Sequence, residues 1–417
     1  MASTAAGAER LSYAAARARV LAAVPALAAR LGAESAPLDE AAGRVLAEPL
    51  IAGEPLPRFD NSGVDGYAAR AADVAGATPG SPVRLAVVER VAAGRAPARA
   101  VGAGEAALVM TGAPLPAGAD CVVMRERTRE ATDEVWVAAA AAHGENVRAR
   151  GEDIAAGETA LPRGRVLAAG DIAVLATLGH PQAQVVRRPR VAILSTGDEL
   201  REPGEPLGPA EVYDASAHAV RALVRAAGAE PGDAWRVRDD ASVVAGALRA
   251  LLAGHDVVLT LGGVSAGDFD PVKLALREFP ALALWRVGMR PGGPQAFGEL
   301  EDGRVVYGLP GNPVSSAVVF DRMARPLLRA AMGAEPADRA SGRARLAEPV
   351  RSVGGRRDFV RVRLEGEPGS RRAWLAGAQS SGAVWSLARA DGLGVIPEEM
   401  EIAPAGTEIE VILWDDV

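Results

Sequence analysis

The sequence predicts a multidomain α/β protein, and three observations lead to this fold class. The chain has 417 residues, which is too long for one hydrophobic core and suggests two to four domains. Strand-like and helix-like segments alternate between residues 191 and 331, a pattern typical of a mostly parallel sheet covered on both faces. Short β-type runs separated by Gly/Pro turns fill residues 50–184 and recur after residue 344, which predicts a β-rich inserted region and a small C-terminal β-barrel-like domain.

The N-terminal segment predicts helices. Residues from Ser12 to Leu31 place apolar side chains at helical spacing, and Pro25 is expected to kink or split that helix. A second, shorter helix is expected from Leu38 to Leu46, before Pro49.

The next region changes to β-type patterning. A helix is expected from Ala168 to Leu178, ending at Gly179, which is a good residue for the position after a helix. The predicted strands before it are Val83–Val91, Ala106–Val109, Cys121–Met124, Val135–Ala138 and Thr159–Leu161.

The alternating region follows. Its predicted strands are Val191–Leu194, Trp235–Val237, Val257–Leu261, Leu284–Val287 and Val305–Tyr307. Its predicted helices are Ala215–Ala227, Ala241–Ala253, Pro271–Glu278 and Pro313–Ala331. After a polar linker, Gly333–Arg343, the last expected strands are Asp358–Leu364, Arg372–Leu375, Gly394–Ile396 and Glu408–Leu413. We therefore expect an N-terminal region 1–190 with an insert at about 50–145, an α/β domain 191–332 and a C-terminal domain 344–417.

Composition excludes several classes of protein. The net charge is −7, with 46 Lys and Arg against 53 Asp and Glu, so we expect neither a nucleic-acid nor a membrane-surface partner. Cys121 is the single cysteine, which rules out an intrachain disulfide and a thiolate metal cluster. No apolar run reaches the ~20 residues that span a bilayer, and the start lacks a secretory pattern. We expect a cytoplasmic protein.

Three segments predict a ligand site at one edge of the sheet: Gly308–Ser315, Thr260–Ser265, and Ser195–Leu200, which places two acids after the strand Val191–Leu194. Gly308–Ser315 follows a strand and precedes a helix, with Asn312 at the expected cap and Pro313 at the first helical position. Free N–H groups at such a turn favour an anion. Thr260–Ser265 repeats the strand-then-glycine pattern, and Gly263 and Ser265 could cradle a phosphate through backbone N–H groups.

Acidic residues also follow the predicted strands, at the edge where ligands bind in open α/β sheets. Unpaired carboxylates there would repel one another, and Mg²⁺ with substrate phosphates would relieve this. The alternative is that some of them cap helices, as Asp270 before Pro271 would. We expect two or three metal ligands among Asp198, Glu199, Asp239, Asp240, Asp268 and Asp270.

Two other loops, and Arg290, can each be interpreted in two ways. Phe59–Tyr67 is either a set of Asx turns or a loop whose acids, Asp60 and Asp65, bind a metal or polar substrate. Arg148–Asp153 is either a surface charge cluster or a loop that brings Asp153 to the same cleft. Taken by itself, Met110–Pro114 predicts a turn. Arg290 is either a surface residue or a fixed cation for an oxyanion.

Together these segments resemble one family, the MoeA-type molybdopterin molybdenumtransferases, which are related to the gephyrin E domain. The resemblance implies a molybdopterin-binding α/β domain, a homodimer and a Mg²⁺-dependent reaction. In that reaction molybdate enters adenylylated molybdopterin (molybdopterin-AMP) and AMP is released, and other proteins of molybdenum cofactor biosynthesis are expected partners. The matching stretches, in chain order, are Phe59–Tyr67, Met110–Pro114, Asn146–Asp153, Ser195–Leu200, Thr260–Ser265, Arg290–Phe297 and Leu309–Ser316.

The resemblance also implies roles for single residues. The catalytic cleft would be lined by Asp60, Thr111, Asp153, Glu199, Asp239 or Asp240, and Asp270, and the metal would be held by Glu199, Asp240 and Asp270. The cofactor would contact Gly262, Gly263, Ser265 and Arg290, in a loop shaped by Pro310 and Pro313. Molybdate would contact Ser315, Arg356 or Arg361, and Ser380 or Ser381.

One departure bears on activity. Family members often carry lysines where this chain has Arg290 and Gly293. Arg290 keeps a charge, whereas Gly293 removes one donor from the expected pocket. Gly293 and the relation to gephyrin would permit a non-catalytic molybdopterin-binding scaffold, and a molybdopterin adenylyltransferase, with the same fold at an earlier step, is the other alternative function. The additional N-terminal and C-terminal regions favour the molybdenum-inserting transferase.

Overall fold

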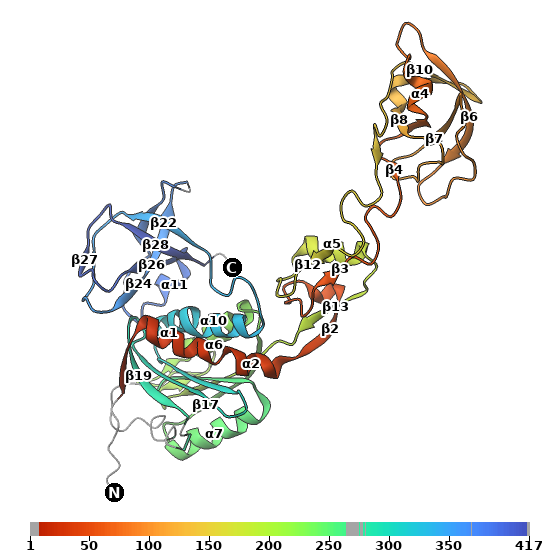
Figure 1. Ribbon diagram of the computed structural model, residues 1–417. Coiled ribbons are helices and arrows are strands. Elements are labelled where there is room, and N and C mark those ends of the chain that lie inside the picture. The colour runs from red at the N-terminus through yellow and green to blue at the C-terminus, as the bar shows by residue number, and fades with distance from the viewer. Residues whose placement is uncertain (1–7, 264–274, 276–277, 280, 368, 415–417) are drawn as a thin grey trace. The chain divides into compact units, whose positions relative to one another are not determined.

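The computed structural model describes residues 8–263, 275, 278–279, 281–367 and 369–414 (Figure 1). The chain divides into two compact units. Unit 1 contains residues 1–48, 163–172 and 181–417, and unit 2 contains residues 49–162 and 173–180. Within the described part of the chain, no helix is both long enough and apolar enough to cross a membrane.

The N-terminal helix of unit 1 is split, as its proline predicts. Helix α1 (Tyr13–Ala22) is followed by α2 (Val24–Leu31), which has Pro25 in its first turn. The side chain of Ser12 caps α1 by accepting a hydrogen bond from the backbone N–H of Ala15 at 3.2 Å. The residues just before α1 form an unpredicted strand, β1 (Glu9–Ser12), which pairs with β19.

The sheet of unit 1 is parallel in one half and antiparallel in the other. The parallel strands lie in the order β17 (Glu230–Val237), β14 (Arg190–Thr196), β18 (Val257–Leu261) and β21 (Val305–Leu309). Next to β21, an antiparallel hairpin of β20 (Pro294–Glu299) and β19 (Ala283–Arg290) continues the sheet. The prediction of a mostly parallel sheet thus holds for the half that carries the alternating helices, and β20 was not predicted.

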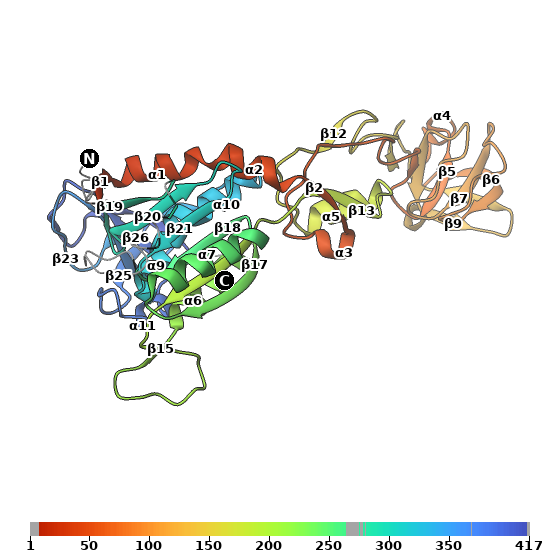
Figure 2. The same ribbon diagram turned by 90° about the horizontal axis from the view of Figure 1, so that it is seen from below.

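Helices cover both faces of this sheet (Figures 1 and 2). Helix α7 (Ala241–Gly254) packs on one face, through a core that includes Leu248 and Val258. The opposite core holds residues of α1 and α2 together with α6 (Ala215–Ala226), α9 (Pro313–Val319) and α10 (Arg325–Ala331). Between α9 and α10 the backbone forms a π-helical turn, Phe320–Ala324, where a continuous α-helix was expected.

The C-terminal part of unit 1 is a closed five-stranded sheet, as predicted. Pairing of β24 with β26 closes the ring, and the parallel pairing of β24 with β19 joins it to the main sheet. The strands, in ring order, are β24 (Arg357–Glu365), β25 (Arg372–Leu375), β22 (Ser341–Leu346), β28 (Glu408–Leu413) and β26 (Gly392–Ile396). Because β22 begins at Ser341, the linker is shorter than the predicted Gly333–Arg343. A short helix, α11 (Trp385–Ala388), and the ladder of β23 (Val350–Arg351) with β27 (Ile402–Ala403) complete this part.

The short helix after α2 was predicted too long. Helix α3 spans Leu38–Ala41 instead of Leu38–Leu46, because Gly43 adopts a φ of 76° and the chain then turns. Val45 and Leu46 form isolated bridges instead of a helical turn. Unit 1 also contains two small ladders, β2 (Ala33–Pro37) with β13 (Gln182–Val186) and β15 (Leu200–Arg201) with β16 (Val212–Tyr213).

Unit 2 is β-rich, as predicted. Gly66 is required in its sheet, because a Cβ atom at that position would lie 2.1 Å from the carbonyl oxygen of Val123. The six-stranded sheet has the order β8 (Cys121–Met124), β5 (Gly66–Ala69), β7 (Glu105–Val109), β6 (Val83–Val91), β10 (Glu134–Val137) and β9 (Thr128–Glu130). Two short ladders accompany it, β3 (Leu50–Ile51) with β12 (Thr159–Leu161) and β4 (Asn61–Ser62) with β11 (Val147–Arg148). Helix α5 (Ala169–Thr177) has residues in both units and is followed by Gly179 with a φ of 81°.

Candidate active site

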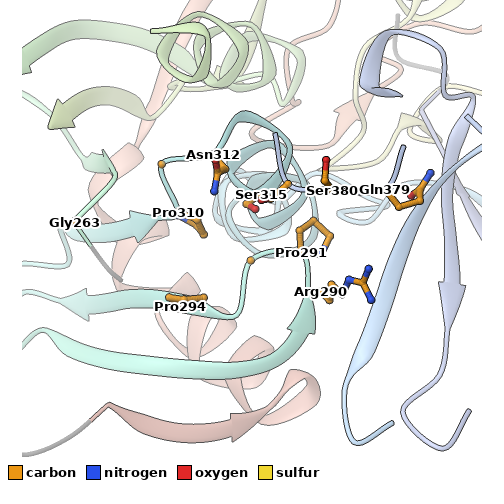
Figure 3. Close-up of a pocket in the computed structure, with 12 residues that line it drawn as sticks. Gly263, Arg290, Pro291, Pro294, Pro310, Asn312, Ser315, Gln379 and Ser380 are labelled. Atoms are coloured by element: carbon orange, nitrogen blue, oxygen red, sulfur yellow. The ribbon is translucent and has the colours of Figure 1, made fainter. Parts of the chain in front are cut away.

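A pocket of about 390 Å³ in unit 1 lies where four segments converge (Figure 3). These segments are the ends of β18 and β21, the turn between β19 and β20, and the loop of residues 379–381 from the C-terminal part. The lining residues are Gly263, Arg290, Pro291, Gly292, Pro294, Pro310, Gly311, Asn312, Ser315, Gln379, Ser380 and Ser381. Five of the predicted cofactor residues, Gly263, Arg290, Pro310, Ser315 and Ser381, are among them.

The floor of the pocket requires glycine. Gly262 and Gly263 adopt φ angles of 92° and 67°, which L side chains rarely adopt. The N–H of Gly262 donates to the carbonyl oxygen of Leu309 at 3.1 Å. A Cβ on Gly311 would lie 3.3 Å from the Cα of Gly262, so the two turns approach each other closely. Gly262 therefore supports the floor, although it is not a lining residue of the described pocket.

The turn between β19 and β20 is held by buried hydrogen bonds. The Nε2 group of Gln295 donates to the carbonyl oxygen of Gly292 at 2.8 Å, and the hydroxyl of Tyr307 donates to Oε1 of Gln295 at 2.7 Å. Complete burial raises the pKa of Tyr307 well above its ordinary value, so this hydroxyl stays protonated and keeps its donor role. These bonds fix the backbone between Arg290 and Pro294.

At the start of α9, side-chain donors are more available to a ligand than backbone N–H groups are. Asn312 occupies the cap position, as predicted, but its side chain forms no capping bond and lines the pocket instead. The N–H of Val314 donates to the carbonyl oxygen of Ser381 at 3.3 Å, and that of Ser316 to Asn312 at 2.9 Å. The hydroxyl of Ser315 forms no hydrogen bond with another described residue, although the residue is only 4% exposed. It can therefore donate to a ligand.

Arg290 is the charged side chain among the described residues that line the pocket. Its guanidinium lies 3.3 Å from the buried carboxylate of Asp358, and that of Arg356 lies 3.4 Å from the other oxygen of the same carboxylate. The side chain of Arg290 is 40% exposed, so it can turn donors toward a ligand while Asp358 holds it. Arg356 is not a lining residue of the described pocket.

Arg361 is buried behind the loop of residues 378–381. It is 1% exposed, and it donates to the carbonyl oxygens of Ala378 and Ser380 and to the hydroxyl of Ser386. Burial lowers its pKa to about 10, and the charge of Arg290 contributes to this shift. Together with Arg290 it also lines an adjoining pocket of about 100 Å³.

The predicted metal ligands do not form a cluster in the described part of the chain. No group of three His, Cys, Asp or Glu side chains that could hold a metal ion occurs among the described residues. Asp240 caps α7, where its Oδ1 accepts from the N–H groups of Ser242 and Val243 and from the Ser242 hydroxyl. These bonds lower its pKa, with the Ser242 hydroxyl as the largest cause. Ser265 and Asp270 lie outside the described residues.

Glu199 remains available as a ligand. It is exposed after β14, its carboxylate lies close to Gly197, and this carboxylate forms no hydrogen bond or ion pair with another described residue. A Cβ on Gly197 would lie 2.6 Å from Oε2 of Glu199, and Gly197 has a φ of 154°. The carboxylate thus folds back over the glycine turn at the end of β14.

In unit 2, three of the predicted segments contact one another. Oδ1 of Asp60 accepts from the N–H of Arg150 at 2.7 Å, and Asp153 donates its N–H to the carbonyl oxygen of Leu56 at 3.0 Å. The N–H of Gly112 donates to Ser62 at 2.8 Å, and β4 pairs with β11. The three loops are therefore one structural element of this unit.

Thr111 lies on the same element and is bound to an acid. Its N–H and its hydroxyl donate to Oδ1 of Asp65, at 2.7 and 2.8 Å. The backbone hydrogen bond, followed by the hydroxyl bond, lowers the pKa of Asp65. Asp65 therefore stays ionised and orients Thr111.

Comparisons with known proteins support one family over nearly the whole chain. Residues 11–179 match the MoeA N-terminal region (domain I and II), residues 192–330 a probable molybdopterin binding domain, and residues 343–414 the MoeA C-terminal region (domain IV). A Mycobacterium tuberculosis protein named molybdopterin molybdenumtransferase 2 is 38% identical over 385 residues, which cover 91% of this chain and 94% of that protein.

Two further similarities agree. A molybdopterin molybdenumtransferase of Nostoc is 36% identical over 411 residues. The aligned residues cover 93% of this chain and 90% of the Nostoc protein. The crystal structure of a molybdopterin biosynthesis MoeA protein from Pyrococcus horikoshii has a TM-score of 0.81 and 33% identity, covering 97% of this chain and 99% of its own. The chain belongs to the MoeA family. The resemblance inferred from seven segments of this MoeA sequence is thus confirmed.

Some residues of the MoeA pocket were not predicted. Gln379 lines it, and its Oε1 accepts from the N–H of Arg361 at 2.9 Å. Asp358 joins Arg290 to Arg356. Asp358 lies in β24 and Gln379 in the loop after β25. The sequence pattern of the C-terminal part indicated strands without indicating which side chains face the α/β domain. The pairing of Arg290 with Asp358 on neighbouring strands β19 and β24 could have been found only from that register.

Proposed function

We propose that this MoeA protein transfers molybdenum from molybdate to molybdopterin and so completes the molybdenum cofactor. Relatives named molybdopterin molybdenumtransferase align with more than nine tenths of the chain. The observation that carries the proposal is the pocket of about 390 Å³, which combines Arg290 with a Ser315 hydroxyl that has no hydrogen bond to another described residue. Molybdate is a tetrahedral dianion, and arginine and hydroxyl donors suit such an oxyanion.

Within this pocket we assign the molybdate contacts to Arg290, Ser315 and the loop of Ser380 and Ser381. Asn312 adds an amide donor, whereas Nε2 of Gln379 already donates to the carbonyl oxygens of Gly377 and Arg361. Of the two arginine alternatives, Arg361 is the positioning residue, because its bonds hold the backbone of residues 378–380. Arg356 would act only indirectly, by sharing Asp358 with Arg290.

The proposed substrate is adenylylated molybdopterin, and AMP is the proposed leaving group. We place its phosphate portion beside the glycine turns of Gly262 and Gly263, where backbone can approach closely. Pro310 and Pro313 hold the β21–α9 turn in shape, with Pro313 as the first residue of α9. Molybdate bound at Ser315 would then lie near the pterin end of the substrate.

Mg²⁺ is the proposed metal, and Glu199 is the described residue best suited to hold it. Its carboxylate is exposed and unpaired within the described residues, and Mg²⁺ commonly takes one or two carboxylates plus substrate phosphates. When bound, Mg²⁺ would neutralise phosphate charge as AMP leaves. Asp270 remains a proposed second ligand, and Asp240 a weaker one because its Oδ1 already caps α7.

In unit 2 we propose catalytic roles for Asp60, Thr111 and Asp153. Asp60 and Asp153 are exposed carboxylates on one element of three loops. Thr111 is oriented by an ionised Asp65. Each can accept or donate a proton or bind a polar substrate group.

The decisive experiment incubates the protein with molybdopterin-AMP, Mg²⁺ and molybdate and measures AMP. AMP release that depends on molybdate supports the proposal. Consumption of ATP with free molybdopterin would instead identify an adenylyltransferase, and tight pterin binding without turnover would identify a binding or scaffold protein.

A homodimer is the proposed assembly, by analogy with the family. Light scattering coupled to size-exclusion chromatography would give a mass of twice 42.8 kDa, whereas a monomeric mass at micromolar concentration would refute it. Location in the cytoplasm and contact with other proteins of the same biosynthesis remain predictions.

A further inference from the structure

Arg290 borders two cavities of unit 1, and its buried counterion borders only one of them. The pocket of about 390 Å³ and the adjoining pocket of about 100 Å³ both have Arg290 in their lining. Asp358 lines the smaller pocket and is not a lining residue of the larger one. The guanidinium of Arg290 points away from Ser315 (Figure 3). The side chain therefore pairs with Asp358 on one side while it borders the larger pocket on the other.

The contact between Arg290 and Asp358 is long for an ion pair. Nη1 of Arg290 donates to Oδ2 of Asp358 at 3.3 Å, whereas charge-assisted N–H···O bonds typically measure about 2.7–2.9 Å. The side chain of Arg290 is 40% exposed and that of Asp358 is 3% exposed. Water can replace Asp358 as the partner of Arg290, but it cannot replace Arg290 as the partner of a buried carboxylate. Arg290 can therefore leave only if another cation holds Asp358.

Arg356 is the cation that can hold it. It lies two residues before Asp358, and its Nε is 3.4 Å from Oδ1 of that carboxylate. Neither of these two buried atoms forms a hydrogen bond in the described structure. A buried donor and a buried acceptor that lie this close need a shift of only about half an ångström to form a bond. Both would then lose the cost of being unsatisfied.

Arg361 favours a move of Arg290 away from the smaller pocket. Burial, followed by the charge of Arg290, lowers the pKa of Arg361 to about 10, so the two guanidinium groups repel each other. The side-chain bonds of Arg361 go to carbonyl and hydroxyl oxygens, which leave its charge in place. Arg361 lines the smaller pocket and is not a lining residue of the larger one. A turn of Arg290 toward the larger pocket therefore relieves this repulsion.

We propose that Arg356 and Asp358 form an exchange pair that releases Arg290 to the oxyanion. When the dianion enters the larger pocket, Arg290 moves its donors from Asp358 to the ligand, and Nε of Arg356 closes on Oδ1 of Asp358. A guanidinium has five N–H donors, so the first contact with the ligand can form before Asp358 lets go. The buried carboxylate keeps a cationic partner throughout. The inference rests on the molybdate site proposed for Arg290 and Ser315, and it makes Arg356 and Asp358 positioning residues.

The exchange gives the two residues opposite effects on affinity. Asp358 competes with the ligand for one guanidinium and so weakens oxyanion binding. Arg356 satisfies Asp358 and so strengthens oxyanion binding. The effect of Arg356 exists only while residue 358 carries a charge, which separates the exchange from a general attraction between arginine and an anion.

The test is calorimetric titration of the full-length protein with sodium molybdate alone, in a double-mutant cycle. Arg356→Gln should bind molybdate about tenfold more weakly than the wild type, because Asp358 would be left unpaired when Arg290 moves. Asp358→Asn should bind molybdate about threefold more tightly, because the competing charge is removed. The combined variant should bind within about threefold of Asp358→Asn, since Arg356 then has no carboxylate to hold.

Two further variants serve as controls. Arg357→Gln removes the same charge from the next residue, which pairs with Glu398 and is not a lining residue of either pocket. It should bind molybdate within about twofold of the wild type, because a partly exposed charge outside the site is screened. Arg290→Gln tests the molybdate site itself and should weaken binding whether or not Asp358 is replaced.

The outcomes distinguish the exchange from the molybdate site. No binding by the wild type, or unchanged binding by Arg290→Gln, would overturn both. If Arg290→Gln weakens binding, three results would overturn the exchange alone. These are an equal loss from Arg356→Gln with and without Asp358→Asn, a tenfold loss from Arg357→Gln, and weaker binding by a folded Asp358→Asn protein.

A crystal structure of the wild type with molybdate gives a second reading that needs no variant to fold. The distance from Nε of Arg356 to Oδ1 of Asp358 should shorten from 3.4 Å to about 2.9 Å, and Arg290 should contact molybdate instead of Asp358. Molybdate bound in the larger pocket with Arg290 still on Asp358 would refute the exchange.

Discussion

The guanidinium group of Arg361 donates to the carbonyl oxygen of Ser380 at a distance of 3.2 Å. Through this bond a buried residue of β24 holds the loop that forms one wall of the candidate active site. Arg361 also donates to Ala378 and Ser386, so several bonds converge on one side chain. The shape of the wall therefore depends on a residue that does not itself line the larger pocket.

Arg361→Lys should loosen this loop. Lysine cannot reproduce a planar fork of donors, so at least one buried carbonyl would lose its partner. We expect a loss of about 1–3 kcal/mol in the free energy of unfolding and about tenfold weaker molybdate binding, measured by urea titration and calorimetry. Arg345→Lys, on the exposed face of β22, is the control. Unchanged molybdate binding in a correctly folded Arg361→Lys protein would show that the loop needs no such support.

Gly292→Ala should damage the opposite wall. Gly292 has a φ of 96°, and a Cβ there would lie 2.2 Å from Cγ2 of Val319. We expect a cost of at least about 2 kcal/mol, from the backbone conformation and from the clash. Val319→Ala in the same protein should recover part of it, because the clash is relieved while the strain of a positive φ remains. If the double variant were no more stable than Gly292→Ala, the clash would not be the cause.

Local patterns predicted most of the elements, because each depends on neighbouring residues. Pro25 split the first helix, and α6 ends at Ala226, one residue before the predicted Ala227 and shortly before Gly228, which has a φ of 86°. Strands β1 and β20 were not predicted, and for β20 there is a physical reason. β20 contains Pro294 and Gly298, which resemble turn residues, and its pairing with β19 and β21 overrides that local preference.

The site was predictable only in part. Arg290 is the last residue of β19, and Pro310 and Ser315 follow β21 of the same sheet, so topology brings them together. The roles of Arg361 and Gln379 depend on how the C-terminal sheet docks, through the register of β24 with β19. No local pattern encodes that register. For Asp240 the local pattern was informative but ambiguous, because an acid between a strand and a helix can bind a ligand or cap the helix. In the structure it caps α7.

Glu199→Gln should slow turnover far more than it weakens pterin binding. A carboxylate without a partner among the described residues is the feature that suits Glu199 to the chemical step, and the amide replacement removes its charge at constant size. We expect at least about a hundredfold loss in kcat, with the dissociation constant of molybdopterin changed less than threefold. Glu301→Gln, an exposed position between β20 and β21, is the control. Equal losses in kcat and pterin affinity would contradict a catalytic role.

Asp240→Asn separates a helix cap from a metal ligand. Asparagine caps helices about as well as aspartate, so the Tm should change little. Because Oδ1 of Asp240 is engaged with Ser242 and Val243, we expect a smaller loss of kcat than in Glu199→Gln, and little change in Mg²⁺ affinity by calorimetry. A loss of Mg²⁺ binding as large as that of Glu199→Gln would instead make Asp240 a principal ligand.

Asp256 should make the fold sensitive to acid. Burial alone would raise the pKa of its carboxyl, but hydrogen bonds from both terminal nitrogens of Arg187 (2.9 and 3.0 Å) and from the N–H of Arg190 (2.9 Å) outweigh burial and lower it below the ordinary 3.8. A carboxyl with a lowered pKa stabilises the fold above its unfolded pKa, and this contribution is lost as pH falls through the folded value.

Asp256→Asn should therefore cost about 2–3 kcal/mol at pH 7, less than a fully buried pair because Arg187 is 31% exposed. The difference between variant and wild type should shrink below about pH 4, as measured by urea unfolding across pH. Asp302→Asn, at a more exposed carboxylate near Arg304, is the control. A difference that stayed constant from pH 7 to pH 3 would show that the charge of Asp256 does not stabilise the fold.

Gly293→Lys should strengthen oxyanion binding, because it adds a cation next to the pocket. Gly293 lies in the β19–β20 turn beside two pocket residues, Gly292 and Pro294. A Cβ there would lie 3.2 Å from the carbonyl oxygen of Val287, so the turn must yield by a few tenths of an ångström. Gly293→Ala carries that steric cost without the charge, and the comparison of lysine with alanine isolates the charge. We expect lysine to bind molybdate about threefold to tenfold more tightly than alanine at low salt, with the gain reduced at 0.5 M salt by screening. Equal affinities for lysine and alanine would mean that Arg290 and Ser315 already supply what the oxyanion needs.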